Sequence, residues 1–265
     1  MHEFELINKY FSKLSSNNKG SLKLNDDVFF DKSKKLVISV DTYVEGVHFI
    51  NFQNPDLVIK KIIRSSISDL ICKGVSPKYY FISGSGNKNT FSKKKLEKIS
   101  KSLHQEQKKF TINLCGGDTT FSKKLSFTII SVGFSDKIIF RNKAKLNDDI
   151  YVTGNLGDSF IGLKVLQKKI HLNRNLTRYF KNKYFHPNLH IDITKKLLSI
   201  ANTSIDISDG LVADLEKLIN NQKLSYVLYL NNIPTSKNLN KLIKSKIIKK
   251  ITSVTFGDDY QILFT

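Results

Sequence analysis

The chain has 265 residues, 40% of them hydrophobic, which is enough to bury the core of one large domain or two ordinary ones. No apolar run approaches the ~20 residues that cross a bilayer, and the acidic N-terminal stretch lacks the basic and apolar segments of a secretory signal. The 43 Lys and Arg against 23 Asp and Glu give a net charge of +20, which would suit nucleic acid, but the lysines are scattered along the chain without an aromatic-basic platform. We therefore expect a solvated basic surface that attracts anionic nucleotides, with no nucleic-acid partner and no membrane partner.

The two cysteines, Cys72 and Cys115, lie in apolar surroundings and form no CxxC pair. Such isolated cysteines are typical of a reducing compartment. We therefore expect a cytoplasmic protein.

The first predicted elements lead to an acidic side chain at the end of a strand. Apolar residues at helical spacing predict a helix over 3–14, and the acidic pair at 26–27 opens a strand over 28–30. The apolar, β-branched run at 36–40 is typical of a buried strand and ends on Asp41. The acidic pair alone can be a simple turn. A carboxylate at the end of a buried strand, however, indicates a site that compensates its charge.

Two further candidates follow Asp41. His48 lies in the next loop, where a lone histidine serves equally well as a local hydrogen-bonding residue or as a substrate contact. Residues 57–75 have the apolar spacing of a helix that ends near Gly74. Asp69 falls within this apolar helix, so it is either buried with a partner or directed into a site, where carboxylates often coordinate metals.

The most specific local signal is Cys115-Gly116-Gly117-Asp118-Thr119-Thr120. Paired glycines after a strand let the backbone approach a ligand, and the freed amides can bind phosphate oxygens. The hard oxygens of Asp118 suit Mg²⁺, and Arg141 is a candidate phosphate clamp. The elements expected around this motif are strands over 79–85, 110–114, 125–134 and 137–141 and a helix over 93–108.

The second half repeats the alternation of strands, glycine turns and helices. In Asp206-Ile207-Ser208-Asp209-Gly210, Ser208 and Asp209 can be an ordinary helix cap or part of a site. Asp258 and Asp259 follow another glycine near the end of the chain. The expected elements are strands over 148–154, 226–230 and 261–265, helices over 160–166, 191–201, 212–219 and 239–248, and a loop over 172–187.

Taken together and in their order, these motifs resemble the thiamine-monophosphate kinases, within the ATP-binding superfamily of aminoimidazole ribonucleotide synthetase. The resemblance covers almost the whole chain. Its pieces are Asp26-Asp27, Ser39-Val40-Asp41, Val44-Glu45-Gly46-Val47-His48-Phe49, Ser68-Asp69, Gly116-Gly117-Asp118-Thr119-Thr120, Tyr151-Val152-Thr153-Gly154 with Leu156-Gly157-Asp158, Asp206-Ile207-Ser208-Asp209-Gly210-Leu211 and Gly257-Asp258-Asp259-Tyr260.

The resemblance implies an α/β (α+β) protein with a two-domain synthetase-like fold. Residues 1–145 would form an N-terminal α/β domain that binds ATP and metal and pairs its sheet with a second copy in a homodimer. Residues 146–265 would form a C-terminal α/β domain, shortened at its C-terminus relative to the family. The implied reaction transfers the γ-phosphoryl group of ATP to thiamine phosphate, giving thiamine diphosphate and ADP.

The resemblance also assigns roles to individual residues. Asp41, Asp118 and Arg141 would be catalytic, and His48 and Asp258 would face thiamine phosphate. The nucleotide contacts would be Gly117, Asp118, Arg141 and Ser208. The Mg²⁺ ligands would be Asp27, Ser39, Val40 through its carbonyl, Asp41, Asp69, Asp118, Asp206 and Asp209.

These residue types suit the reaction. The attacking phosphate oxygen is already an anion near neutral pH, so no strong general base is needed. Bringing two polyanions together is the difficulty, and positioning with charge neutralisation by Mg²⁺ and Arg141 overcomes it. A requirement for K⁺ stays open.

Several positions depart from the family pattern. Asn25 stands in place of Gly, Val40 in place of Thr, and Phe256-Gly257-Asp258-Asp259 in place of Gly-Gly-Glu-Asp. Val40 offers no hydroxyl, and Asp258 is one methylene shorter than Glu. Two alternatives are another ATP-dependent enzyme of the superfamily and a nucleotide-binding homologue with impaired catalysis.

Overall fold

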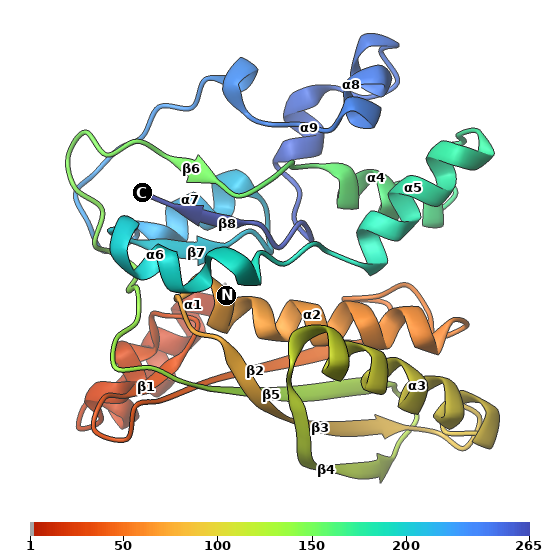
Figure 1. The fold of residues 1–265 in the computed structure, drawn as a ribbon, viewed down its shortest axis with the longest axis horizontal. Helices are drawn as coiled ribbons and strands as arrows, with labels where there is room; N and C mark the ends of the chain where they lie inside the picture. The colour runs from red at the N-terminus through yellow and green to blue at the C-terminus, as the bar shows by residue number, and fades with distance from the viewer. Residues whose placement is uncertain (1–2) are drawn as a thin grey trace.

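A computed structural model describes residues 3–265. It contains two β-sheets with one long helix packed between them (Figure 1). The first sheet has the strand order β1-β2-β5-β3-β4, and the second has the order β6-β8-β7. Strands β3 and β4 pair in parallel, and the other pairs are antiparallel. The strands are β1 (Phe29–Asp31), β2 (Leu36–Val44), β3 (Pro77–Gly86), β4 (Asn113–Phe121), β5 (Ser126–Phe134), β6 (Tyr151–Val152), β7 (Ser204–Asp206) and β8 (Ile262–Phe264).

The helices accompany both sheets. The α-helices are α1 (Glu3–Leu6), α2 (Pro55–Cys72), α3 (Lys93–Phe110), α4 (Asp158–Leu166), α5 (Arg174–Phe185), α6 (Thr194–Ile200), α7 (Leu211–Leu218), α8 (Lys237–Lys244) and α9 (Lys250–Val254). Shorter helical turns are η1 (Ile7–Phe11), η2 (Ser12–Ser15), η3 (Lys19–Leu24), η4 (Ile191–Ile193) and η5 (Leu230–Asn232). Among residues 3–265, no helix combines the length and the apolar character that a bilayer span requires.

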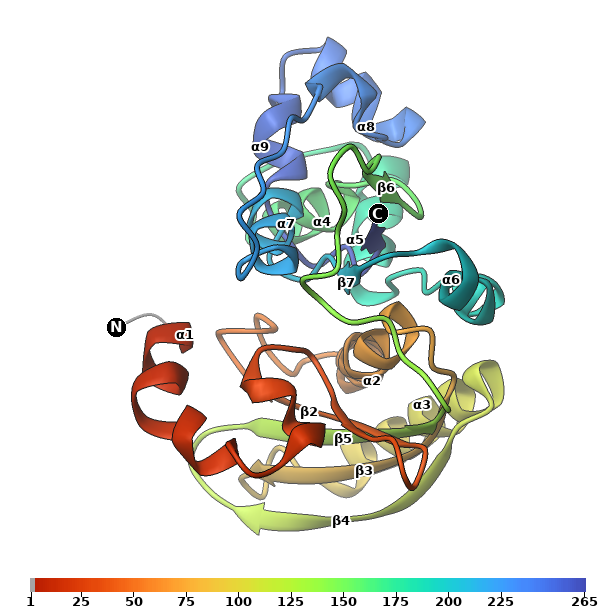
Figure 2. The ribbon, with the colours of Figure 1, turned by 90° about the vertical axis from the view of Figure 1, so that its left-hand side faces the viewer.

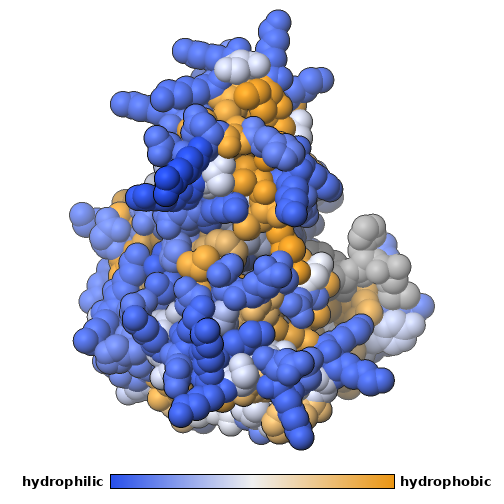
Figure 3. Space-filling model, turned by 90° about the vertical axis from the view of Figure 1, so that its right-hand side faces the viewer, coloured by the Kyte–Doolittle hydropathy of each residue, from blue (hydrophilic) through white to orange (hydrophobic). Residues whose placement is uncertain are grey.

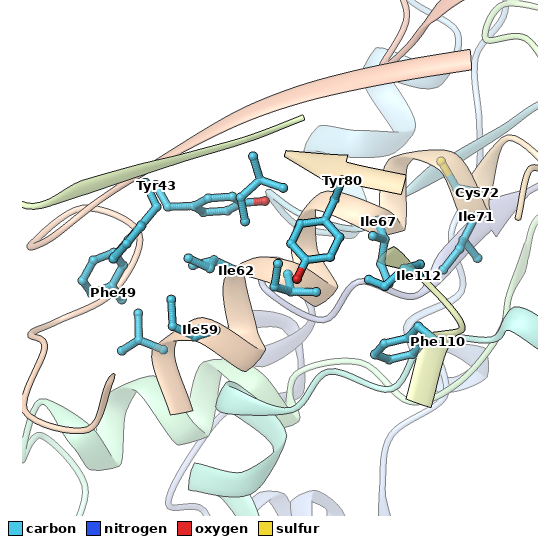
Figure 4. Close-up of a cluster of buried hydrophobic side chains, with 14 of the residues drawn as sticks. Tyr43, Phe49, Ile59, Ile62, Ile67, Ile71, Cys72, Tyr80, Phe110 and Ile112 are labelled. Carbon is cyan, nitrogen blue, oxygen red and sulfur yellow. The ribbon is translucent and has the colours of Figure 1, made fainter. Parts of the chain in front are cut away.

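Helices α2 and α3 cover one face of the five-stranded sheet (Figures 1 and 2). Isoleucines of α2, such as Ile59 and Ile62, pack with Tyr43, Tyr80 and Phe110 in a buried cluster between helices and sheet (Figure 4). Helix α2 is buried on nearly all sides because its other side lies against the second half of the chain. This helix is therefore the structural link between the two sheets.

The contacts between α2 and the second half are polar as well as apolar. The Lys73 ammonium donates to the Ser204 carbonyl at 2.8 Å, and the Ser204 hydroxyl donates to the Cys72 carbonyl. Nearer the middle of the helix, Arg64 donates to the Pro187 carbonyl at 3.2 Å. The two bonds at Ser204 fix the end of α2 against the first residue of β7, and the Arg64 bond holds the middle of α2 against Pro187.

The five-stranded sheet is built from residues before 135, and the three-stranded sheet from residues after 150. The predicted domain boundary at 145/146 falls in the segment that connects them. It stays our proposal for the division of the chain.

The expectation of a loop over 172–187 was wrong, because residues 174–185 form α5. Phe180 and Tyr184, four residues apart, are buried on one side of this helix, and the Asn173 side chain accepts a hydrogen bond from the Leu176 amide at its start. Helix α5 also packs closely on α4, since a Cβ at Gly162 would lie 2.3 Å from the Phe180 carbonyl oxygen. The basic residues of this stretch hid an amphipathic helix.

Other expected elements differ from the structure. Residues 137–141 and 226–230 form no strand, whereas residues 250–254 form the unforeseen α9. The expected helix over 3–14 is a succession of α1, η1 and η2.

The two glycines at 116–117 do not follow a strand that ends at 114, as expected, but lie inside one. Residues 113–121 form one strand, β4, paired with β3. A Cβ at Gly117 would lie 1.8 Å from the Ile82 carbonyl oxygen, so glycine is needed here for the approach of the neighbouring strand. The pattern correctly indicated a close backbone approach, but the approaching group is β3.

Figure 3 shows hydrophilic side chains over most of one face, with a band of hydrophobic ones running down its upper half. The hydrophilic side chains are dispersed over this face rather than gathered in one patch. The expectation that nucleic acid is not a partner stays a prediction.

We expect the Glu106→Ala variant to be about 3–5 kcal/mol less stable than the wild type. The Arg64 guanidinium on α2 and the Glu106 carboxylate on α3 are both buried and form a two-pronged ion pair at 2.7 and 3.0 Å. Removing the carboxylate leaves the guanidinium buried without its partner. Urea denaturation measures the change, and Glu97→Ala, at an exposed position of the same helix, is the matched control. Equal midpoints for the two variants would contradict the assignment.

Candidate functional site

A cavity of about 650 Å³ lies between the two halves of the chain. Its walls come from β2 and the loop after it, from α2, from the segments after β5 and β7, and from the stretch before β8. Ten of the predicted site residues line this cavity: Asp27, Val40, Asp41, His48, Asp69, Arg141, Asp206, Ser208, Asp209 and Asp258.

Three of these carboxylates have no ion pair with a Lys or Arg in the described residues. Asp41 lies in β2, Asp69 in the last turn of α2, and Asp206 at the end of β7. Tyr43 donates a hydrogen bond to Asp41 at 3.3 Å, and Ser39 donates one to Asp69 at 2.5 Å. One oxygen of Asp206, Oδ2, is buried without a hydrogen-bond partner.

Burial shifts the titration of all three carboxylates in the same direction. It raises the pKa of Asp41 to about 6 and the pKa of Asp206 to about 6. Burial also raises the pKa of Asp69 well above its usual value of 3.8, and repulsion from Asp41 and Asp206 adds to this rise. The three negative charges therefore lie close enough to oppose one another's ionisation.

Unlike these three carboxylates, those of Asp26 and Asp27 form ion pairs with buried cations. The Lys73 ammonium lies 2.7 Å from Asp26 and 2.8 Å from Asp27. Arg141 donates through Nε to Asp27 at 3.1 Å and through its backbone amide to Asp26 at 3.0 Å. Both acids are thus neutralised by buried cations, which removes the simple-turn interpretation for this pair.

The segment 206–210 resolves the alternatives for Ser208 and Asp209. The cap at the start of α7 is provided by Asp214, whose carboxylate accepts from the backbone amides of Asp209 and Gly210 at 2.9 Å. Ser208 and Asp209 therefore have no capping role, and both line the cavity. Asp209 pairs instead with Lys217, which also contacts Asp214 at 3.0 Å.

The two predicted substrate contacts, His48 and Asp258, lie on opposite halves of the chain. Both are linked to the buried Lys61, Asp258 directly and His48 through Tyr184. The Lys61 ammonium is 2.6 Å from Asp258 and 3.9 Å from the centre of the Tyr184 ring. The Tyr184 hydroxyl donates to the His48 carbonyl at 3.4 Å. Because His48 Nδ1 accepts from the Val44 amide at 3.0 Å, its neutral ring carries the proton on Nε2.

Asp258 and Asp259 diverge although they are neighbours. Asp258 has φ +70°, in the left-handed region, and lines the cavity. Asp259 is buried elsewhere and accepts from the Gly157 amide at 2.6 Å and the Ser159 amide at 3.3 Å, at the start of α4. Asp258 is therefore the acid available to a ligand, and Asp259 supports the fold.

Three predicted residues do not line the cavity. The Ser39 side chain is buried and holds Asp69, as described above. Gly117 and Asp118 lie on β4, where Asp118 is exposed and accepts a hydrogen bond from Thr120 at 3.4 Å. Asp118 lies in the same row across the sheet as Thr42, which belongs to the cavity wall, with β3 and β5 between them. About three strand spacings, ~14 Å, therefore separate these two residues.

Residues 3–265 contain no ready-made group of three acidic, histidine or cysteine side chains that would enclose a metal ion. The carboxylate oxygens of Asp41, Asp69 and Asp206 are nevertheless the hard donors that Mg²⁺ prefers. Mg²⁺ usually keeps several waters and takes its other ligands from substrate phosphates, so a full protein cage is not needed.

Comparison with known proteins identifies the family. Residues 24–135 match the family described as "AIR synthase related protein, N-terminal domain". A thiamine-monophosphate kinase of Buchnera aphidicola subsp. Schizaphis graminum is 36% identical over 272 residues, covering 100% of this chain and 83% of the relative. The chain belongs to the thiamine-monophosphate kinase family. A thiamine-monophosphate kinase of Haemophilus influenzae is 32% identical and covers 100% of this chain and 81% of its own length.

Solved structures of thiamine-monophosphate kinases share the fold. One, described as AaThiL complexed with AMPPCP and TMP, is 28% identical with a TM-score of 0.90, covering 99% of this chain and 84% of the other. The thiamine-monophosphate kinase of Aquifex aeolicus is 29% identical with a TM-score of 0.87, covering 100% and 89%. The predicted α/β (α+β) synthetase-like fold is therefore confirmed.

The sequence analysis of this thiamine-monophosphate kinase family member did not predict most of the basic and aromatic side chains around the cavity. Lys61 and Lys73 are buried partners of acids, and Lys217 lies in the cavity wall. Phe160 and Phe256 also line the cavity. Lysine is so frequent in this chain that no single one stood out. For Phe256, the departure from the family glycine was an available signal.

Without bound metal, we expect Asp41→Asn to be more stable than the wild type at pH 8, by about 1–3 kcal/mol. The pKa of Asp41 rises from 3.8 to about 6 in the folded state, so its stabilising contribution is present at low pH and is lost as the pH rises through about 6. The neutral amide avoids this loss. Thermal melts in EDTA at pH 5 and pH 8 measure the difference, which should be larger at pH 8. Asp136→Asn, at an exposed surface pair, is the control, and a less stable Asp41→Asn at pH 8 would refute the electrostatic argument.

Proposed function

We propose that this protein transfers the γ-phosphoryl group of ATP to thiamine phosphate, giving thiamine diphosphate and ADP. The observation that carries the proposal is a set of three carboxylates, Asp41, Asp69 and Asp206, in a cavity of about 650 Å³. None of the three has an ion-pair partner in the part of the chain that the structure describes. Buried carboxylates that repel one another are costly unless a ligand supplies positive charge. Family membership supplies the identity of the two substrates.

Asp41, Asp69 and Asp206 would hold Mg²⁺, with Asp27, Asp209 and the Val40 carbonyl as further ligands. Bound Mg²⁺ would neutralise the charge on the two phosphate groups and hold them in line. Ser39 supports this set through its bond to Asp69. The protein's own contribution is to keep these oxygens fixed before the substrates arrive, which lowers the cost of reorganisation.

We propose that Arg141 binds the nucleotide. A second cavity of about 670 Å³ adjoins the first and shares Asp26 and Arg141 with it. Lys19, Lys23 and Lys143 also line this second cavity, so the end of the site near Arg141 is basic. We place the ATP phosphates between Arg141 and Ser208, with Arg141 as the fixed cation on the transferred group.

The acceptor would lie at the other end of the cavity, between His48 and Asp258. His48 presents its Nε2 proton as a donor, which suits a phosphate oxygen. Lys61 holds Asp258 from behind and, through Tyr184, fixes the backbone at His48. The acceptor oxygen is already anionic, so these groups bind and orient it rather than removing a proton.

A homodimer would complete the site. The face of the five-stranded sheet opposite α2 and α3 has no helix over it in Figures 1 and 2. Large apolar side chains lie exposed on its strands, with Val40 60% exposed, Phe81 37% and Phe134 52%. Gly117 and Asp118 belong to the exposed strand β4 of this sheet, so their predicted roles would be fulfilled in the cavity of a second copy.

We also propose a cytoplasmic location, because Cys72 and Cys115 are both unpaired, as in proteins of reducing compartments.

The direct test is to incubate the protein with ATP, Mg²⁺ and thiamine phosphate and to follow thiamine diphosphate and ADP by chromatography. We expect both products in equal amounts, and we expect EDTA to abolish them. Asp41→Asn should lower the rate at least ~100-fold while still unfolding in one cooperative thermal transition, because it removes a charged metal ligand but not the fold. Parallel reactions with Na⁺ in place of K⁺ test the open requirement for K⁺. ADP release without thiamine diphosphate, or an active Asp41→Asn variant, would overturn the proposal.

The dimer is tested by light scattering after gel filtration. We expect the wild type to elute as a dimer and Phe81→Asp as a monomer, because a charge in the centre of an apolar interface must be desolvated without a partner. Val227→Asp is the matched control, since Val227 is 71% exposed and lies outside both sheets. The monomeric variant should also lose activity if Asp118 acts across the interface. A monomeric wild type with full activity would contradict this arrangement.

A further inference from the structure

Two phenylalanine rings form a stacked pair in the wall of the cavity. The rings of Phe160 and Phe256 are nearly parallel, with 13° between their planes and 4.3 Å between their centres. Phe160 lies in the first turn of α4 and is buried, whereas Phe256 is 48% exposed. The inner ring is thus fixed by the core and holds the outer ring, whose other face remains open.

Phe256 is thus a half-exposed phenylalanine that stacks on a buried one in the wall of the cavity. An aromatic ring prefers to stack on another flat ring or to face a cation. The only cation that lies near both rings in the described residues is Lys164, at 4.8 Å from Phe160 and 5.6 Å from Phe256, and Lys164 does not line the cavity. The face of Phe256 open to the cavity is therefore free for a ligand.

The position of Phe256 decides which ligand this is. It precedes Gly257 and Asp258, and it shares the cavity wall with Leu163 and Val47. Phe256, Leu163 and Val47 do not line the second cavity, which meets the first at Asp26 and Arg141. Phe256 lies two residues before Asp258, and Val47 lies directly before His48. Because Asp258 and His48 are the groups proposed to face thiamine phosphate, we place the ring pair at the acceptor end of the site.

We propose that the open face of Phe256 stacks on a ring of thiamine phosphate and sets the specificity for this acceptor. This inference rests on the proposed function. Thiamine phosphate has two flat rings, one of which is a permanent cation, and both are suited to the π-face of a phenylalanine. Phe256 stands where the family pattern has glycine, so this contact is a property of this chain.

A tryptophan at this position provides a direct reporter, because the chain contains no Trp. The Phe256→Trp variant is titrated first with ADP and Mg²⁺ and then with thiamine phosphate, and its fluorescence is recorded. We expect ADP to leave the emission nearly unchanged and thiamine phosphate to quench it to saturation. Tyr229→Trp, at a 69% exposed position outside the cavity, is the matched control and should respond to neither. Quenching by ADP alone, or no response to thiamine phosphate, would overturn the proposal.

Steady-state kinetics separate this inference from the proposed function. In Phe256→Ala we expect the KM for thiamine phosphate to rise about tenfold while the KM for ATP stays within about twofold. Phe256→Tyr keeps the ring and should restore the KM, whereas Phe256→Leu keeps the apolar contact with Phe160 and should not. If the wild type forms thiamine diphosphate and Phe256→Ala has an unchanged KM for thiamine phosphate, the inference fails alone. If the wild type forms no thiamine diphosphate, the proposed function fails.

Discussion

A single buried ammonium group fixes the geometry on which the cavity depends. Lys73 is completely buried at the end of α2, where it contacts Asp26, Asp27 and the Ser204 carbonyl. Burial alone would lower the pKa of Lys73, but its attraction to nearby acids, Asp26 and Asp69 among them, outweighs burial and raises the pKa. The ammonium therefore stays charged and joins the N-terminal loop, the central helix and β7. Each of these segments carries or adjoins a carboxylate of the site.

The cations around the cavity divide its acids into two groups. Asp26, Asp27, Asp209 and Asp258 each contact a lysine or arginine, and these pairs stabilise the walls. Within residues 3–265, Asp41, Asp69 and Asp206 have no such contact, although the chain has 43 Lys and Arg. A fold selected only for stability would pair them as well. Their mutual repulsion is a cost to the fold that bound metal and phosphate would offset, so stability and function compete at these positions.

The sequence allowed the acids to be predicted but not their environment. Asp41 was recognisable because it follows an apolar, strand-like run, although the predicted strand end was wrong, since β2 continues past Asp41 to Val44. Asp206 was recognisable from the motif Asp206-Ile207-Ser208-Asp209-Gly210. The pairing of Lys73 with Asp26 depends on long-range packing, and no short-range pattern encodes it. Gly117 shows a further limit, because glycine permits close approach without specifying the approaching group. The amphipathic helix α5 was overlooked because its basic residues masked the apolar side with Phe180 and Tyr184.

The site needs residues from both halves of the chain. Asp41 and Asp69 come from the first half and Asp206 from the second, so the carboxylate set exists only when α2 is packed against β7. The same reasoning extends beyond one copy. Thr42 lies in the cavity wall, and Asp118 lies at the far side of the same sheet, across β5 and β3, on a strand exposed along its whole length. A rigid sheet cannot bring its two edges together, so an acid on β4 can serve a cavity near β2 only if another sheet faces it.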